Sequence, residues 1–281
     1  MIIEDILIPL DGSEHAKTAV SYGIYLAGKI KATLTGLHVI DIRLIHGPVF
    51  TDVSGSIGIP SYEEFSPAIE SSLDARADMI LHDFRVQCEA AKINAKIKKM
   101  TGIIDDAIIE EGQGRCDWII LAQRGEHFHI EGGAILGSTT QSVVRRSGKP
   151  VLVTPKEYRE INSMAIAFDG SPPAQKALNL AAELAKLTGW PLTIVTIAND
   201  QRWGKEITEK AGEYLTPFAI ENKTVVLSGS EDKELLNFTR KGKTDMLVMG
   251  AYGHNIIREL VVGSLTSSII RKSTVPVLLT R

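Results

Sequence analysis

The chain contains one series of sequence blocks twice, and this internal repeat limits its fold more than any other feature. Residues 5–13 read DILIPLDGS and residues 163–171 read SMAIAFDGS. CDWIILAQRG (116–125) matches TDMLVMGAYG (244–253), and ILGSTTQSVVRRSGKPVLVTP (135–155) matches VVGSLTSSIIRKSTVPVLLTR (261–281). Blocks matched in the same order indicate a duplicated unit. We therefore expect two domains, 1–155 and 162–281, with the linker PKEYREIN between them.

Each half alternates short apolar runs with amphipathic segments, which predicts parallel strands connected by helices. The expected strands are 3–10, 32–40, 95–101, 117–122 and 150–154, then 163–168, 191–198, 223–228, 245–249 and 275–280. The expected helices are 14–30, 68–93, 104–114 and 138–147, then 172–188, 201–219, 230–241 and 264–272. The fold class is α/β, with two tandem, doubly wound, five-stranded parallel sheets.

The last strand of each half, PVLVT or PVLLT, is short and apolar. An apolar edge strand left open invites aggregation. We therefore expect the two halves to cover each other's edges and form an internal pseudo-dimer. Whether two chains then associate as a homodimer stays open.

The first half is longer than the second. Asp11 and Asp169 are 158 positions apart, whereas Gly102 and Gly229 are 127 apart, so the first half carries 31 extra residues between them. The extra length falls in 41–67, rich in Gly, Pro and Ser, which predicts a long loop. A lid over a site, a partner contact and a passive insertion are all open interpretations.

Composition excludes several classes of protein. A net charge of −3 and a pI near 6.2 argue against a nucleic-acid-binding surface. The acidic N-terminus does not resemble a signal peptide, and no apolar run approaches the ~20 residues that span a bilayer. Two cysteines, Cys88 and Cys116, are expected to be buried thiols. We expect a cytoplasmic protein without membrane or nucleic-acid partners.

The best candidate site lies in the second half, where a glycine-rich stretch follows the fourth strand. Gly250 and Gly253 allow close approach of backbone to a ligand. After nine intervening residues, Gly263 and Ser264 open the last helix. A helix N-terminus offers unpaired N–H groups to phosphate. Asp169, after the first strand, provides an acceptor for ribose hydroxyls. Alternatively, these residues only form turns and cap helices.

With Ile197 at the end of the second strand, these motifs resemble the tandem two-domain form of the universal stress protein family. The resemblance implies an ATP-binding sandwich that dimerises through the fifth strand and serves in stress responses. It also implies that adenine lies near Ile197 and Asp169, that phosphates lie on Gly253, Gly263 and Ser264, and that Mg²⁺ can accompany them. The corresponding residues of the first half are Asp11, Val39, Gly125, Gly137 and Ser138.

The first half departs from this pattern. Ala122 replaces the first glycine, and eleven residues rather than nine separate Gly125 from Gly137. We expect this degenerate site not to bind ATP in the ordinary way; it is empty, altered, or specific for another ligand. His127 and His129, in the same irregular stretch, are weak candidates for metal ligands, and we expect no metal.

Three functions remain open at this point. The first is a regulatory module that binds ATP or a related adenine nucleotide and acts on a protein partner that the sequence does not identify. The second is a slow ATPase, although the sequence contains no Walker phosphate loop and no evident general base. The third is a nucleotide-free interaction scaffold whose first domain binds another small ligand or metal.

Overall fold

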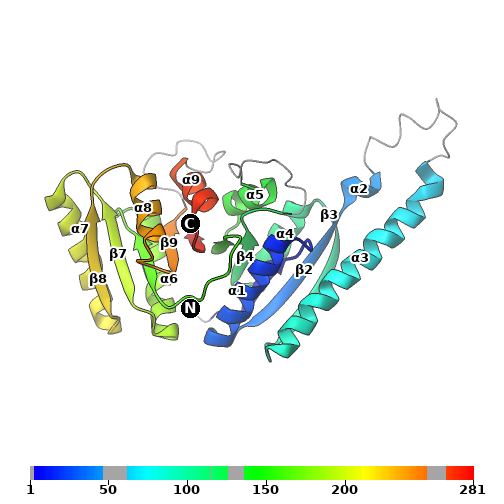
Figure 1. Ribbon diagram of the computed structural model, residues 1–281, viewed down its shortest axis with the longest axis horizontal. Coiled ribbons are helices and arrows are strands. Elements are labelled where there is room, and N and C mark those ends of the chain that lie inside the picture. The colour runs from blue at the N-terminus through cyan, green and yellow to red at the C-terminus, as the bar shows by residue number, and fades with distance from the viewer. Residues whose placement is uncertain (1–2, 47–61, 115, 126–135, 252–263) are drawn as a thin grey trace.

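The computed structural model describes residues 3–46, 62–114, 116–125, 136–251 and 264–281. Within these residues, ten strands form one continuous sheet in the order β3-β2-β1-β4-β5-β10-β9-β6-β7-β8. Each half thus forms a doubly wound five-stranded sheet, and the two are joined edge to edge. The fold class expected from the sequence is confirmed (Figure 1).

The elements of the first half follow the predicted alternation. They are β1 (Asp5–Pro9), α1 (Glu14–Ile30), β2 (Thr33–Asp41), α2 (Ile42–His46), α3 (Tyr62–Ala90), β3 (Ala95–Gly102), α4 (Ile104–Gln113), β4 (Trp118–Ala122), α5 (Ser138–Arg146) and β5 (Val151–Thr154). All strand pairs within this half are parallel.

The second half repeats this order. Its elements are β6 (Met164–Ala167), α6 (Pro172–Thr188), β7 (Leu192–Ile197), α7 (Gln201–Leu215), the short 3-10 helix η2 (Thr216–Phe218), β8 (Asn222–Leu227), α8 (Glu231–Arg240), β9 (Met246–Gly250), α9 (Ser264–Lys272) and β10 (Val277–Thr280). Its strand pairs are also parallel.

The two halves meet at β5 and β10, which pair antiparallel with Leu152 opposite Leu278. Both leucines are fully buried. The expected internal pseudo-dimer is therefore confirmed: the apolar last strand of each half covers that of the other. We call this β5–β10 pair the seam.

Two hydrophobic clusters cover the two faces of the sheet, and each extends through both halves. Leu26 of α1 and Leu184 of α6 belong to one cluster. Val143 of α5 and Ile269 of α9 belong to the other. Because each cluster crosses the seam, neither half has a core of its own among the described residues.

The prediction of a loop over 41–67 is wrong at both ends. Ile42–His46 form α2, and α3 begins at Tyr62 and continues through Pro67. The loop was predicted from the Gly, Pro and Ser content of 41–67, since these residues are typical of loops and proline disfavours the interior of a helix. Leu81, Phe84 and Cys88, one helical turn apart, pack the C-terminal part of α3 into the core. Residues 47–61 lie outside the described residues.

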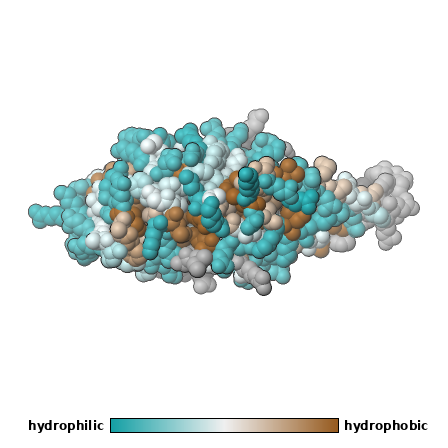
Figure 2. Space-filling view, turned by 90° about the horizontal axis from the view of Figure 1, so that it is seen from below, coloured by the Kyte–Doolittle hydropathy of each residue, from teal (hydrophilic) through white to brown (hydrophobic). Residues whose placement is uncertain are grey.

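Both cysteines are buried and carry no disulfide, as expected. Burial raises the pKa of the Cys88 thiol to about 11 and that of Cys116 to about 12. At neutral pH both side chains therefore behave as small apolar groups. Figure 2 shows that the face seen from below is largely hydrophilic, with hydrophobic areas between the hydrophilic ones. No described helix is long and apolar enough to cross a bilayer; the cytoplasmic location remains a prediction.

Candidate functional site

The carboxyl ends of β1 and β6 carry the two repeated aspartates in equivalent geometry. The Oδ1 atoms of Asp11 and Asp169 each accept a hydrogen bond of 2.9 Å from the backbone N–H two residues later. The glycines that follow them, Gly12 and Gly170, have positive φ angles of 83° and 76°. Each turn then leads into a helix capped by a serine, Ser13 or Ser171. Each aspartate therefore shapes its turn through Oδ1.

A further pair of hydrogen bonds shows where the halves have diverged. In the second half, the Thr196 hydroxyl donates to the carbonyl of Phe168 at 2.7 Å. In the first half, His38 Nδ1 lies 2.7 Å from the carbonyl of Leu10. Since a carbonyl only accepts, His38 Nδ1 carries the hydrogen. A histidine thus replaces a threonine beside the first site.

The described residues of the second site lie at one edge of the sheet. Gly250 ends β9, Asp169 follows β6 and Ile197 ends β7, and these three strands are neighbours in the sheet. Ser264 is the first residue of α9, whose first turn contains no acidic residue. Gly253 and Gly263 lie outside the described residues.

Gly250 has a packing role that the sequence analysis did not identify. A Cβ atom at this position would lie 2.8 Å from the carbonyl carbon of Pro173 and 3.0 Å from the backbone nitrogen of Ala174. The start of α6 therefore passes too close to β9 for any side chain at position 250. The approach of this helix therefore requires a glycine at position 250 whether or not a ligand binds nearby.

We expect Gly250→Ala to lower the free energy of unfolding by about 1–3 kcal/mol, because its methyl group meets backbone that cannot rotate away. Denaturation with urea, followed by circular dichroism, measures this loss. The reverse change at the equivalent position, Ala122→Gly, serves as the comparison because it adds no atoms. A Gly250→Ala protein as stable as the parent would contradict this packing argument.

The first half contains a described cavity of about 410 Å³ at the corresponding sheet edge. Its walls come from the ends of β1, β2 and β4 and from the start of α5: Pro9–Asp11, Leu37–Asp41, Leu121, Ala122 and Gly137–Thr140. Asp11, Val39, Gly125, Gly137 and Ser138, predicted to form the degenerate first site, all line it. The structure therefore brings these five residues together around one hollow.

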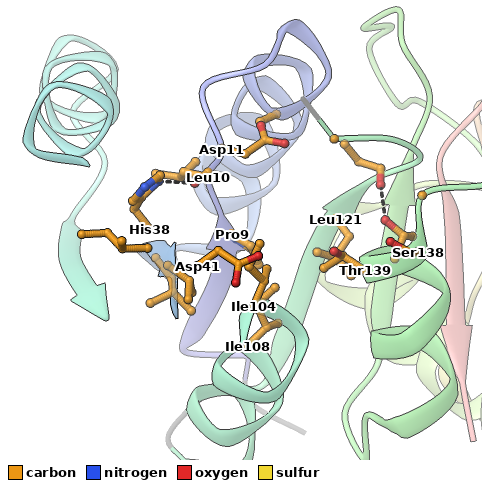
Figure 3. Close-up of a pocket in the computed structure, with 18 of the residues that line it drawn as sticks. Pro9, Leu10, Asp11, His38, Asp41, Ile104, Ile108, Leu121, Ser138 and Thr139 are labelled. Atoms are coloured by element: carbon orange, nitrogen blue, oxygen red, sulfur yellow. Dashed lines mark hydrogen bonds between the residues drawn. The ribbon is translucent and has the colours of Figure 1, made fainter. Parts of the chain in front are cut away.

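Figure 3 shows how the polar and apolar sides of this cavity are arranged. Asp11 lies above it on the β1–α1 turn, and Ser138 and Thr139 lie on the side formed by α5. Ile104 and Ile108 of α4 lie below. The cavity thus has an apolar side on α4 and a polar side at the start of α5.

Three arginines line the cavity: Arg43, Arg76 and Arg124. The Arg43 guanidinium binds the Asp41 carboxylate with both Nε and Nη2, the latter at 2.6 Å. Arg76 Nη2 donates to the carbonyl of Asp11 at 3.3 Å. Burial and then the positive charge of Arg124 lower the pKa of His15 at the start of α1. Two carboxylates, those of Asp11 and Asp41, also line the cavity and partly offset the charge of these arginines.

The sequence analysis did not identify these arginines as site residues. They come from α2, α3 and the segment after β4, and no regular spacing connects them. Aligning the two halves would have singled out Arg124, because the corresponding residue of the second half is Tyr252.

The metal candidates His127 and His129 lie outside the described residues. Elsewhere in the described part of the chain, no cluster of three or more His, Cys, Asp or Glu side chains has the geometry to hold a metal ion.

Comparison with known proteins gives a consistent match across the chain. A family model described as the universal stress protein family matches residues 3–155 and 205–281. The Synechocystis universal stress protein Slr1230 is 31% identical, with 98% of this chain and 99% of that protein aligned. Universal stress protein MJ0577 from Methanocaldococcus jannaschii is 30% identical over 56% of this chain and 98% of its own length.

A solved structure agrees with the fold. The crystal structure of a universal stress protein from Archaeoglobus fulgidus superposes with a TM-score of 0.76 at 22% identity, covering 99% of this chain and 96% of that one. At this identity the likeness concerns the fold alone.

Proposed function

Because the chain belongs to the universal stress protein family, we propose that it is a stress-response regulatory protein that binds ATP or a related adenine nucleotide. We place the nucleotide mainly in the second domain, residues 162–281. The observation that carries this proposal is the motif Gly250-x-x-Gly253, nine residues, then Gly263-Ser264.

The described geometry supports this placement. Met249 of β9 pairs with Ala167 of β6, and Ala167 pairs with Val195 of β7, so the carboxyl ends of these strands are adjacent. In parallel α/β sheets this edge is where ligands bind. We assign the adenine to Ile197, the ribose hydroxyls to Asp169 and the phosphates to Gly253, Gly263 and Ser264.

The start of α9 suits a phosphate group. Its first turn contains no carboxylate that would repel an anion, and basic residues lie only in its last turn. The N–H groups of the first helical turn lack partners within the helix and carry a partial positive charge. Mg²⁺, which is held mainly by phosphate oxygens and water, would need few protein ligands here.

The test is to identify and count the nucleotide. Mass spectrometry of the denatured, purified protein shows which small molecules it carries, and calorimetry with ATP and Mg²⁺ measures the stoichiometry. We expect one nucleotide per chain. Two sites of similar affinity would contradict the placement in the second domain. An absence of heat together with an absence of carried nucleotide would favour a scaffold.

A further inference from the structure

The cavity of the first domain is lined by three arginines that have no basic counterpart at the corresponding positions of the second half, and these arginines indicate its ligand. We propose that the cavity is a second, separate binding site for a small organic anion with a single phosphate or carboxylate group on an apolar body. The site does not depend on the nucleotide proposed for the second domain.

The three arginines of this cavity belong to the first half alone. Arg43 lies in the insertion and has no counterpart. Arg76 corresponds to Trp203, and the alignment is supported in space because Ile80 and Ile207 contact Gly12 and Gly170 in the same way. With Tyr252 opposite Arg124, none of the three positions is basic in the second half. These three arginines are therefore specific to the first half and do not belong to the repeated pattern.

The polar end of the cavity is built to receive an anion. Gly137 caps α5, and a Cβ atom added to Gly137 would lie 3.4 Å from the Cα atom of Arg124. The backbone of Arg124 therefore lies beside the start of α5. The first turn of α5 contains no acidic residue. Arg124, a half-buried residue, and the positive end of a nine-residue helix therefore both line the cavity.

The other end of the cavity is apolar. Val39 and Ile108 are buried in its wall, and Ile104 and Leu73 are partly exposed there. Leu44, from the insertion, is 43% exposed beside them. A volume of about 410 Å³ lies in the range of small-molecule pockets. This end suits a ring or a branched hydrocarbon rather than a bare ion.

The charge balance favours one anionic group over a triphosphate. Three arginines and two aspartates leave a formal charge of +1 on the wall. A Cβ atom on Gly125 would lie only 2.7 Å from Oδ2 of Asp11, so this carboxylate already lies against the loop where phosphates would be expected. One anionic group matches the formal charge of the wall, whereas a triphosphate would exceed it.

The experiment uses 1-naphthyl phosphate as the probe, because it combines one phosphate with an apolar ring system and is fluorescent. Titration is performed on the full chain carrying Gly263→Val, which disables the proposed nucleotide site. We expect one molecule of probe per chain. We also expect binding at least about tenfold weaker for 1-naphthol and for inorganic phosphate, each of which lacks one half of the probe.

Two variants locate the probe. Arg124→Gln should weaken binding roughly tenfold, because it removes a charged partner of the phosphate. Leu44→Glu, on an exposed side chain that the fold does not need, should weaken it severalfold by repulsion. The matched control for Arg124→Gln is Arg85→Gln, on the outer part of α3 and away from the cavity. The matched control for Leu44→Glu is Leu187→Glu, on α6. Both controls should leave the affinity for the probe unchanged.

Three results would overturn the proposal. The first is that 1-naphthyl phosphate does not bind. The second is that neither Arg124→Gln nor Leu44→Glu weakens binding more than its control. The third is that ATP displaces the probe from the Gly263→Val protein at equal or lower concentration, which would make the cavity a triphosphate site. None of these results bears on whether unmodified protein binds ATP in the second domain.

Discussion

Leu278→Ala should lower the free energy of unfolding by about 2–5 kcal/mol, the range for a buried leucine replaced by alanine. Leu278 is fully buried and lies opposite Leu152 across the seam. The side chain belongs to the cluster that includes α1 of the first half and α6 of the second, so its loss leaves a cavity in a core that both halves share. Urea denaturation measures the change.

The same experiment tests whether the halves unfold together. We expect a single transition by circular dichroism and by tryptophan fluorescence, because Trp118 and Trp190 lie in different halves of one cluster. Leu187→Ala is the control: this leucine is 50% exposed on α6, so its loss should cost little. A loss below about 1 kcal/mol for Leu278→Ala, or two separate transitions, would show that the seam does not unite the cores.

Gly263→Val should weaken ATP binding about 100-fold. Gly263 immediately precedes Ser264, the first residue of α9. A branched side chain there crowds the approach of phosphate to the helix N-terminus. Two lost hydrogen bonds to a charged group, at about 1.5 kcal/mol each, correspond to this factor. Calorimetry with ATP and Mg²⁺ measures it.

The equivalent glycine of the first half provides the matched control. Gly137 caps α5 and corresponds to Gly263, which precedes α9. The backbone φ of Gly137 is −59°, a value that accommodates a side chain. Gly137→Val should therefore leave ATP affinity unchanged. If Gly137→Val abolished ATP binding and Gly263→Val did not, the nucleotide would belong to the first domain.

Much of the fold follows from local patterns in the sequence. Apolar runs such as IILA and MLVMG are buried strands, and Ser13 and Ser171 start helices where their hydroxyls accept hydrogen bonds from the backbone. The seam was predicted because two apolar strands could not both remain open edges. The start of α3 was not predicted, because proline usually marks a helix boundary and Pro67 lies inside this helix.

The first cavity could be predicted only in part. The repeat located Asp11, Val39 and Gly125 at a sheet edge, since each has a counterpart in the second half. It could not locate Arg43 and Arg76, because their approach depends on how α2 and α3 fold back beside β2. Contacts of this kind depend on tertiary structure and leave no periodic pattern.

The seam has a consequence for how the two halves can change. In a symmetric dimer of identical chains, every substitution occurs twice and must suit both environments. Here the Gln123 side chain donates to the carbonyl of Ser273 at 2.9 Å, while the equivalent residue, Ala251, has no side chain to do so. In the fused chain a substitution changes only one half. One copy can therefore acquire a new specificity while the other retains the ancestral one.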